Sequence, residues 1–240
     1  MPRVDTRLVE LSAETTSPEY ITDPDYFVPY VRDPSKHVFV YRATADGVPG
    51  VVELTEVDEL GRTDWTVDGF AIAGRFEREG FDDQLSVPIE RVLSGTPVEQ
   101  SDFPVSFYKV IAVDPEKRSR GIGTQLGATS VAPLFESPPV LVVAWIRENP
   151  ANRRLVAQHG MNRIATFESY FPPDWECPEC GFGTECTCDA EMYAWFGDER
   201  DAALADAAPD VEADAGTGSD AGEGGDAEAD IGDEPGVASH

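Results

Sequence analysis

Short runs of hydrophobic residues, separated by polar segments rich in Gly, Pro and Asp, divide the chain into candidate strands and helices. Val105–Val113 has the composition of a central strand, and Val140–Ile146 is continuous in apolar residues, as expected for parallel pairing. Alternation of apolar and polar positions predicts further strands at Thr6–Ser12, His37–Ala43, Gly50–Val57, Asn162–Tyr170 and Met192–Phe196. An Asp-Gly pair separates the second and third of these, so we expect them to form an antiparallel hairpin.

Helical spacing of apolar residues predicts helices at Tyr20–Val31, Gly121–Leu134 and Asn152–His159, the first interrupted by prolines. The pattern of Thr63–Asp102 admits a strand at Thr66–Ala73 and a short helix at Val87–Leu93 without deciding its structure. Strands and helices alternate along most of the chain, which indicates a mixed α/β domain.

Charge changes this picture at the C-terminal end. The 240 residues include 46 acidic and 18 basic ones, a formal charge of −28, in a composition that is 41% hydrophobic. That composition excludes a wholly disordered chain. Residues 198–240 hold fourteen carboxylates and one arginine, a net charge of −13, with few large apolar side chains. We therefore predict one folded domain over residues 1–197 and a disordered acidic tail over residues 198–240.

The body of the chain is also acidic, because residues 1–197 carry the remaining charge of −15 with only three lysines. Carboxylates scattered over the whole surface are typical of adaptation to high salt. A tail that mimics nucleic acid or docks a basic partner is the alternative. The shortage of Lys and Arg argues against binding nucleic acid through a broad basic surface. No apolar run of about 18–20 residues and no signal-peptide pattern is found, so we expect a cytoplasmic protein without a membrane partner.

A glycine-containing loop after the strand at Val105–Val113 carries the clearest chemical signal. Gly121 and Gly123 open the following helix, whose backbone N–H groups suit a pyrophosphate, and Arg118 and Arg120 flank them. A dinucleotide fingerprint would need a third glycine where Leu126 stands, and no Gly-Lys-Ser/Thr of a P-loop occurs. The loop therefore indicates an anionic ligand outside these two classes.

The segments Val113–Pro115 and Arg118–Gly123 resemble motif A of the GNAT superfamily of acyl-CoA-dependent N-acyltransferases in order and spacing. The second motif of that family is matched by Asn149, Leu155 and Gly160. The resemblance implies a GNAT fold, with a mixed central sheet, a splayed parallel strand pair and flanking helices. It implies acetyl-CoA as co-substrate. Backbone groups of Ile111 and Val113 would pair with the pantetheine, and the pyrophosphate would contact Arg118, Arg120, Gly121, Ile122, Gly123 and Thr124, with Asn149 beside the cofactor.

The resemblance implies transfer of an acetyl group to a primary amine, which must be neutral when it attacks. Val156 stands where the family often has a tyrosine that protonates the leaving thiolate, and Glu168 and Tyr170 are the candidates for catalytic proton transfer. A catalytically weak CoA-binding regulator, a protein-interaction adaptor and an enzyme for longer acyl groups are alternatives. The acceptor is a small-molecule or protein amine, and the protein a monomer or a homodimer.

All four cysteines lie within residues 177–188, which points to a metal. Cys177, Cys180, Cys186 and Cys188 form a Cys-x-x-Cys pair followed by a Cys-x-Cys pair. Four thiolates complete a closed tetrahedral Zn²⁺ site, so we expect a structural zinc knuckle in the loop before the last strand. Two disulfides are the alternative, and a reducing cytoplasm disfavours them.

Overall fold

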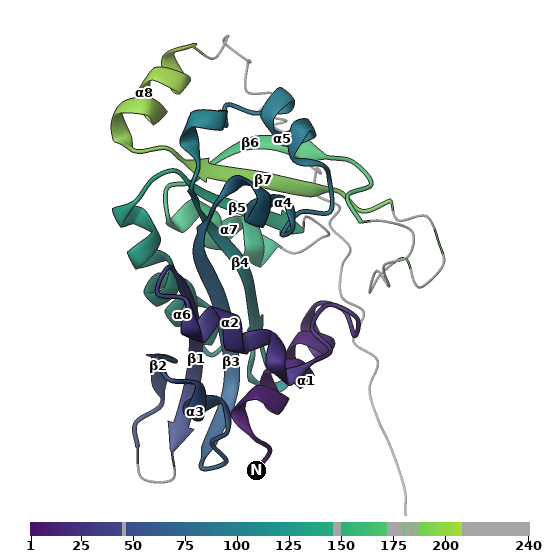
Figure 1. Cartoon of the computed structure of the whole chain (residues 1–240), viewed down its shortest axis with the longest axis vertical. Coiled ribbons are helices and arrows are strands. Elements are labelled where there is room, and N and C mark those ends of the chain that lie inside the picture. Colours follow the sequence, from purple (N-terminus) through teal and green to yellow (C-terminus); the bar gives the residue numbers. More distant parts are fainter. Residues whose placement is uncertain (45–46, 146–149, 172–179, 181–183, 185–186, 208–240) are drawn as a thin grey trace, which may run out of the picture.

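The computed structural model describes residues 1–44, 47–145, 150–171, 180, 184 and 187–207. Its centre is a seven-stranded sheet of order β2-β1-β3-β4-β5-β7-β6 (Figure 1). Neighbouring strands are antiparallel except β4 and β5, which are parallel. The strands are β1 (Lys36–Thr44), β2 (Gly50–Glu53), β3 (Trp65–Phe76), β4 (Val105–Val113), β5 (Val140–Trp145), β6 (Asn162–Phe167) and β7 (Ala190–Trp195). The mixed α/β class and the predicted β1–β2 hairpin are confirmed.

Helices cover both faces of the sheet. The α-helices are α1 (Val4–Thr15), α2 (Val28–Arg32), α3 (Val57–Leu60), α4 (Arg78–Asp82), α5 (Ile89–Gly95), α6 (Ile122–Val131), α7 (Pro150–Gln158) and α8 (Asp198–Ala207). Short 3-10 helices are η1 (Pro24–Phe27), η2 (Gln100–Asp102), η3 (Pro115–Lys117) and η4 (Ala132–Glu136). Among the described helices, none combines the length and the apolar composition that a membrane crossing needs.

Two hydrophobic clusters lie on opposite sides of the sheet, as the alternating side chains of a strand require. In β3, Phe70 belongs to the cluster under α1 and α2, whereas its neighbour Ala71 belongs to the cluster under α6. Figure 1 shows α1 and α2 crossing one face of β1 and β3, with α6 beside the same strands on the other. We call these the α1 face and the α6 face.

The strand predicted at Thr6–Ser12 is wrong, because these residues lie in α1. Val4, Leu8 and Leu11 are buried at helical spacing and pack into the α1-face cluster. In so short a run, alternation and helical spacing coincide at several positions. Contact with the sheet decides between them, since an amphipathic helix buries one stripe whereas an isolated strand leaves its hydrogen bonds unmade.

The acidic tail does not begin at residue 198 as predicted, because Asp198–Ala207 form α8. Asp198, Glu199 and Asp201 lie in its first turn, where carboxylates favour the helix dipole. Arg200 is 2.5 Å from Asp102 Oδ1 and donates to the Pro97 carbonyl at 2.5 Å, which joins the helix to the body. Residues 208–240 lie outside the described residues.

Candidate functional site

The parallel strands β4 and β5 pair over only part of their lengths. Registered pairs join Ser106 to Val140, Phe107 to Leu141 and Tyr108 to Val142, and the ladder ends there although β4 continues to Val113. Beyond Tyr108 the edge of β4 that faces β5 has no strand partner in the described part of the sheet. We call this unpaired stretch, between the end of β4 and β5, the β4–β5 gap. Its unpaired backbone groups can hydrogen-bond an extended ligand as a further strand would.

The open end of the gap leads to the glycine-containing loop. Gly121 is the N-cap of α6 with φ of 80°, a left-handed conformation that glycine adopts without strain, and it supplies no side-chain cap. The first amides of the ten-residue α6 therefore lack a side-chain acceptor, and they lie at the positive end of the helix dipole. Arg118 and Arg120 are exposed beside this helix end. The arrangement suits a phosphate group.

Close packing fixes α6 against the sheet next to the gap. A β-carbon built on Gly69 of β3 would lie 2.8 Å from the Ala112 carbonyl oxygen and 3.0 Å from Leu126 Cδ1 of α6. One built on Gly123 would lie 3.7 Å from Val113 Cγ2, an ordinary contact. Glycine at position 69 thus lets the helix approach the sheet, and the first turn of α6 lies at the end of β4.

Helix α1 holds the start of the same loop from the other face. Arg7 Nη2 donates to Asp114 Oδ2 at 2.9 Å, and Asp114 Oδ1 accepts from the Glu116 amide at 2.9 Å. The Asp114 amide donates to the Asp68 carbonyl at 2.9 Å. These contacts orient the loop between β4 and α6 before any ligand binds.

The predicted cofactor-binding residues that the structure describes lie at the end of β4, in the loop after it and at the start of α6. Ile111 and Val113 lie on the half-buried end of β4 and pack toward the α6-face cluster. The side chain of Ile122 is buried in the α6-face cluster and anchors the start of the helix. Gly121 and Thr124 are exposed at the helix start and Gly123 is half-buried. Asn149 lies outside the described residues.

The two candidates for proton transfer lie after β6, in different environments. Glu168 is exposed in the turn that follows the strand. Tyr170 is 6% exposed, and its hydroxyl accepts from the Ser86 amide at 3.1 Å. Burial raises the pKa of Tyr170. This hydrogen bond ties the end of β6 to the segment between α4 and α5.

Lys109 is a residue that the sequence analysis missed. It is the first residue of β4 beyond the last pair with β5, and its Nζ donates to Gln84 Oε1. Nζ lies 5.6 Å, 5.6 Å and 5.9 Å from the ring centroids of Tyr20, Tyr26 and Tyr30. The sequence signal for this residue was a lysine within an otherwise apolar strand. Its environment could not be predicted, because the three tyrosines are far from it in the chain.

A buried carboxylate on β7 forms a second polar cluster. Glu191 is 3% exposed. Its carboxylate accepts hydrogen bonds from Arg153 and Arg163 at 3.1 to 3.3 Å and from the Tyr193 hydroxyl at 2.5 Å. Burial alone would raise the pKa of Glu191, but these hydrogen bonds hold it below the usual value. Its acceptor oxygens are satisfied, so this cluster joins α7, β6 and β7 rather than offering a free base.

Only part of the cysteine cluster can be described. Cys180 Sγ and Cys188 Sγ lie 3.6 Å apart, which is too long for a disulfide of about 2.05 Å. Cys177 and Cys186 lie outside the described residues, and among those described no group of three or more potential metal ligands occurs. Two thiolates on one tetrahedral ion with bonds of about 2.3 Å would be about 3.8 Å apart.

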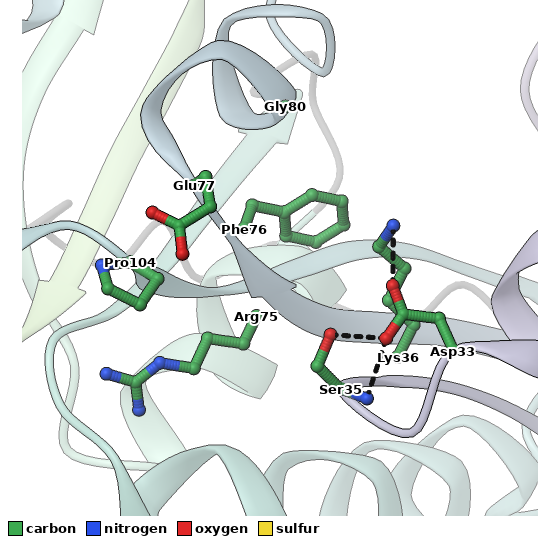
Figure 2. A pocket seen from close by; sticks show the side chains of 8 residues that line it. All are labelled: Asp33, Ser35, Lys36, Arg75, Phe76, Glu77, Gly80 and Pro104. Atoms are coloured by element: carbon green, nitrogen blue, oxygen red, sulfur yellow. Dashed lines mark hydrogen bonds and ion pairs between the residues drawn. The ribbon is translucent and has the colours of Figure 1, made fainter.

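A surface cavity of about 270 Å³ lies at the other end of β4 and is separate from the gap. Its lining includes Arg75, Phe76 and Pro104, and Figure 2 shows Asp33 between Lys36 and Ser35. Phe76 pairs with Val105, the first residue of β4, whereas the gap begins after Tyr108. The unpaired backbone, and not this cavity, therefore defines the candidate site.

No protein-family model matches the chain, and no match was found among curated proteins. Similar solved structures include a Bacillus subtilis acetyltransferase in complex with CoA, with 13% identity and a TM-score of 0.46 over 80% of this chain and 93% of that one. A ribosomal-protein-alanine N-acetyltransferase from Brucella melitensis has 14% identity and a TM-score of 0.46 over 80% and 94%. A GCN5-related N-acetyltransferase from Kribbella flavida has 16% identity and a TM-score of 0.44 over 82% and 91%. With TM-scores below 0.5, these likenesses establish no family for this chain.

Proposed function

We propose that this protein is an acyl-CoA-dependent N-acyltransferase of GNAT type that uses acetyl-CoA. The observation that carries the proposal is the β4–β5 gap, which leads directly to the uncapped amides of α6. An extended chain with amide groups, such as pantetheine, can pair with the backbone of Ile111 and Val113. A pyrophosphate at the open end can accept from the amides of Gly121 to Thr124, with Arg118 and Arg120 adding charge-assisted hydrogen bonds.

The backbone also provides what acyl transfer requires at the carbonyl. A backbone amide of β4 that borders the gap can donate to the oxyanion that forms when the amine attacks the thioester. A thiolate with an ordinary pKa of about 8.5 can leave without full protonation, so the buried Val156 does not prevent transfer. Glu168 and Tyr170 remain our proposals for proton transfer to and from the amine.

Calorimetric titration with CoA tests the binding half of this proposal. Replacing both Arg118 and Arg120 with Glu is expected to lower the affinity tenfold or more, on the basis of about 1.5–3 kcal/mol for a charge-assisted hydrogen bond. The exposed Arg154 on α7 provides a matched control, and Arg154→Glu should leave the affinity nearly unchanged. Equal affinities in the double variant and the control would contradict the assigned site.

Release of free thiol from acetyl-CoA tests the chemical half. The panel of acceptors comprises free amino acids, polyamines and peptides with a free N-terminus or lysine, since the proposed acceptor is a small-molecule or protein amine. Thiol release with any of them supports the enzyme. Tight CoA binding with no release across the panel would favour a catalytically weak CoA-binding regulator. Sedimentation in the same buffer distinguishes monomer from homodimer.

We also propose that Cys177, Cys180, Cys186 and Cys188 hold one structural Zn²⁺. The 3.6 Å between Cys180 Sγ and Cys188 Sγ fits two corners of a tetrahedral thiolate site and excludes a disulfide between these two. Elemental analysis of protein purified without chelator should find one zinc per chain, and Cys180→Ser should reduce that content. A folded, metal-free protein or two mapped disulfides would contradict the site.

A further inference from the structure

Lys109 lies at the closed end of the β4–β5 gap, at a place where the strand is irregular. In the pairing with β3, Ile72 faces Val110 and Ala73 faces Tyr108, so Lys109 is an extra residue between them. Such a β-bulge bends the strand and redirects a side chain. The bulge and the end of the pairing with β5 therefore coincide at one residue.

On the α1 face, tyrosine rings and a glutamine amide surround the side chain of Lys109. Three tyrosines, Tyr20, Tyr26 and Tyr30, place their rings within 5.9 Å of Nζ. The acceptor of Nζ, Gln84 Oε1, also accepts from the Tyr30 hydroxyl at 3.2 Å. Gln84 Nε2 donates to the Gly80 carbonyl at 2.9 Å, so the amide is held in one orientation.

No carboxylate within ion-pair distance of Lys109 Nζ is found in the described part of the chain. This contrasts with Lys36, which lies 3.1 Å from Asp33, and with a chain that holds 46 acidic residues. Enclosed lysines are ordinarily paired with a carboxylate. The enclosure of Lys109 instead consists of aromatic rings and one neutral amide oxygen. No negative charge in it holds the amine in its protonated form.

Burial, with a smaller repulsion from Lys36, lowers the pKa of Lys109 to about 8. The ring faces act in the opposite direction, because they stabilise the ammonium form. With a pKa of about 8, about half of the side chain is neutral at pH 8, against well under 1% for an ordinary lysine with a pKa near 10.4. Acyl transfer requires this neutral form.

The direction of the gap determines where the thioester of bound acetyl-CoA would lie relative to Lys109. On the proposed function, the pyrophosphate lies at the start of α6, at the open end, and an extended pantetheine arm runs along β4 from Val113 toward Lys109. The thioester at the tip of that arm then reaches the closed end of the gap. The backbone of Lys109 borders this end, and its side chain leaves the strand toward Gln84 and the three tyrosines.

We propose that Lys109 is an internal acyl acceptor, whose Nζ takes the acetyl group from acetyl-CoA bound in the gap. This inference rests on the proposed function. The neutral Nζ forms a bond to the thioester carbonyl carbon, the C–S bond breaks, and CoA leaves as thiolate. The proton that Nζ loses goes to the thiolate or to water, so no further reagent is consumed. The acetylated Nζ keeps one N–H for Gln84 Oε1 and presents its methyl group to the tyrosine rings.

The chain allows a clean test because it contains only three lysines, Lys36, Lys109 and Lys117. Purified full-length protein is incubated at pH 8 with acetyl-CoA, and the acetyl groups are located by peptide mass spectrometry. We expect a mass increase of one acetyl group, at Lys109, with a rate at least tenfold above that of Lys117. The rate should saturate with acetyl-CoA and fall when CoA is added as a competitor. Lys109→Arg should remove the modification, while Lys36→Arg should retain it.

Two outcomes would overturn the inference and leave the proposed function standing. The first is CoA binding by calorimetry with Lys109 acetylated no faster than Lys117. The second is acetylation of Lys109 by acetyl phosphate as fast as by acetyl-CoA and unaffected by CoA, which would show a reactive lysine without a donor site. Failure to bind CoA at all would instead contradict the proposed function. Thermal unfolding of Lys109→Arg checks that the variant is folded.

Discussion

Replacing Gly69 with Ala is the most direct test of how α6 is placed beside the candidate site. The new β-carbon would lie 2.8 Å from the Ala112 carbonyl oxygen, 3.0 Å from Leu126 Cδ1 and 3.3 Å from Ile122 Cγ2. Leu126 can adjust, but the Ala112 carbonyl belongs to the backbone of a paired strand. Either β4 or the first turn of α6 must therefore move.

The expected cost follows from two opposing contributions. Overpacking of a well-packed core costs about 1–3 kcal/mol. Replacing Gly with Ala recovers about 0.4–1 kcal/mol by restricting the unfolded chain. Gly69→Ala should therefore lower the free energy of unfolding by up to about 2.5 kcal/mol, and it should weaken CoA binding because the start of α6 is displaced.

Gly50→Ala is the matched control, since it is also a strand glycine and a β-carbon there meets nothing within 4 Å. Only the second contribution applies to it, so this variant should be as stable as the unchanged protein or slightly more stable. Urea unfolding measures both free energies, and calorimetry measures CoA affinity. If Gly69→Ala and Gly50→Ala unfold with the same free energy, the close approach of α6 to β3 is not as described.

Three further predictions concern the loop, the β7 cluster and the charge. Gly121→Ala should lower stability by about 1 kcal/mol in urea unfolding because its φ is 80°, whereas Gly123→Ala, with its nearest contact at 3.7 Å, should not. Glu191→Gln should destabilise the protein by about 1–3 kcal/mol at pH 7. Because the pKa of Glu191 is lowered on folding, this difference should hold above about pH 4.5 and shrink in thermal unfolding as the pH falls below it. Potassium chloride should raise the unfolding temperature by screening repulsion among the 46 carboxylates. An unfolding temperature that does not change up to about 1 M salt would contradict the hypothesis that the acidic composition is an adaptation to high salt.

The sequence alone predicted most of the local elements and the candidate anion site. Strands β4 and β5 carry strong apolar runs, and the two glycines after β4 mark a turn into a helix. The strands and this turn could be predicted without knowing which segments pack against them. Charge distribution is a property of composition and needs no fold. These features depend on residues close together in the chain, where periodicity and turn chemistry act directly.

Only the tertiary structure decided which groups meet. The segment from Val4 to Thr15 is a helix because its apolar stripe packs on the sheet, although its pattern also fits a strand. The β4–β5 gap arises where parallel pairing ends after three registered pairs, which depends on how two strands distant in the chain meet in the sheet. Lys109 has an unusual environment because Tyr20, Tyr26 and Tyr30 fold over it from a segment about 80 residues away. A lysine's pKa depends on burial and neighbouring charges, and both are fixed by long-range packing that no local pattern records.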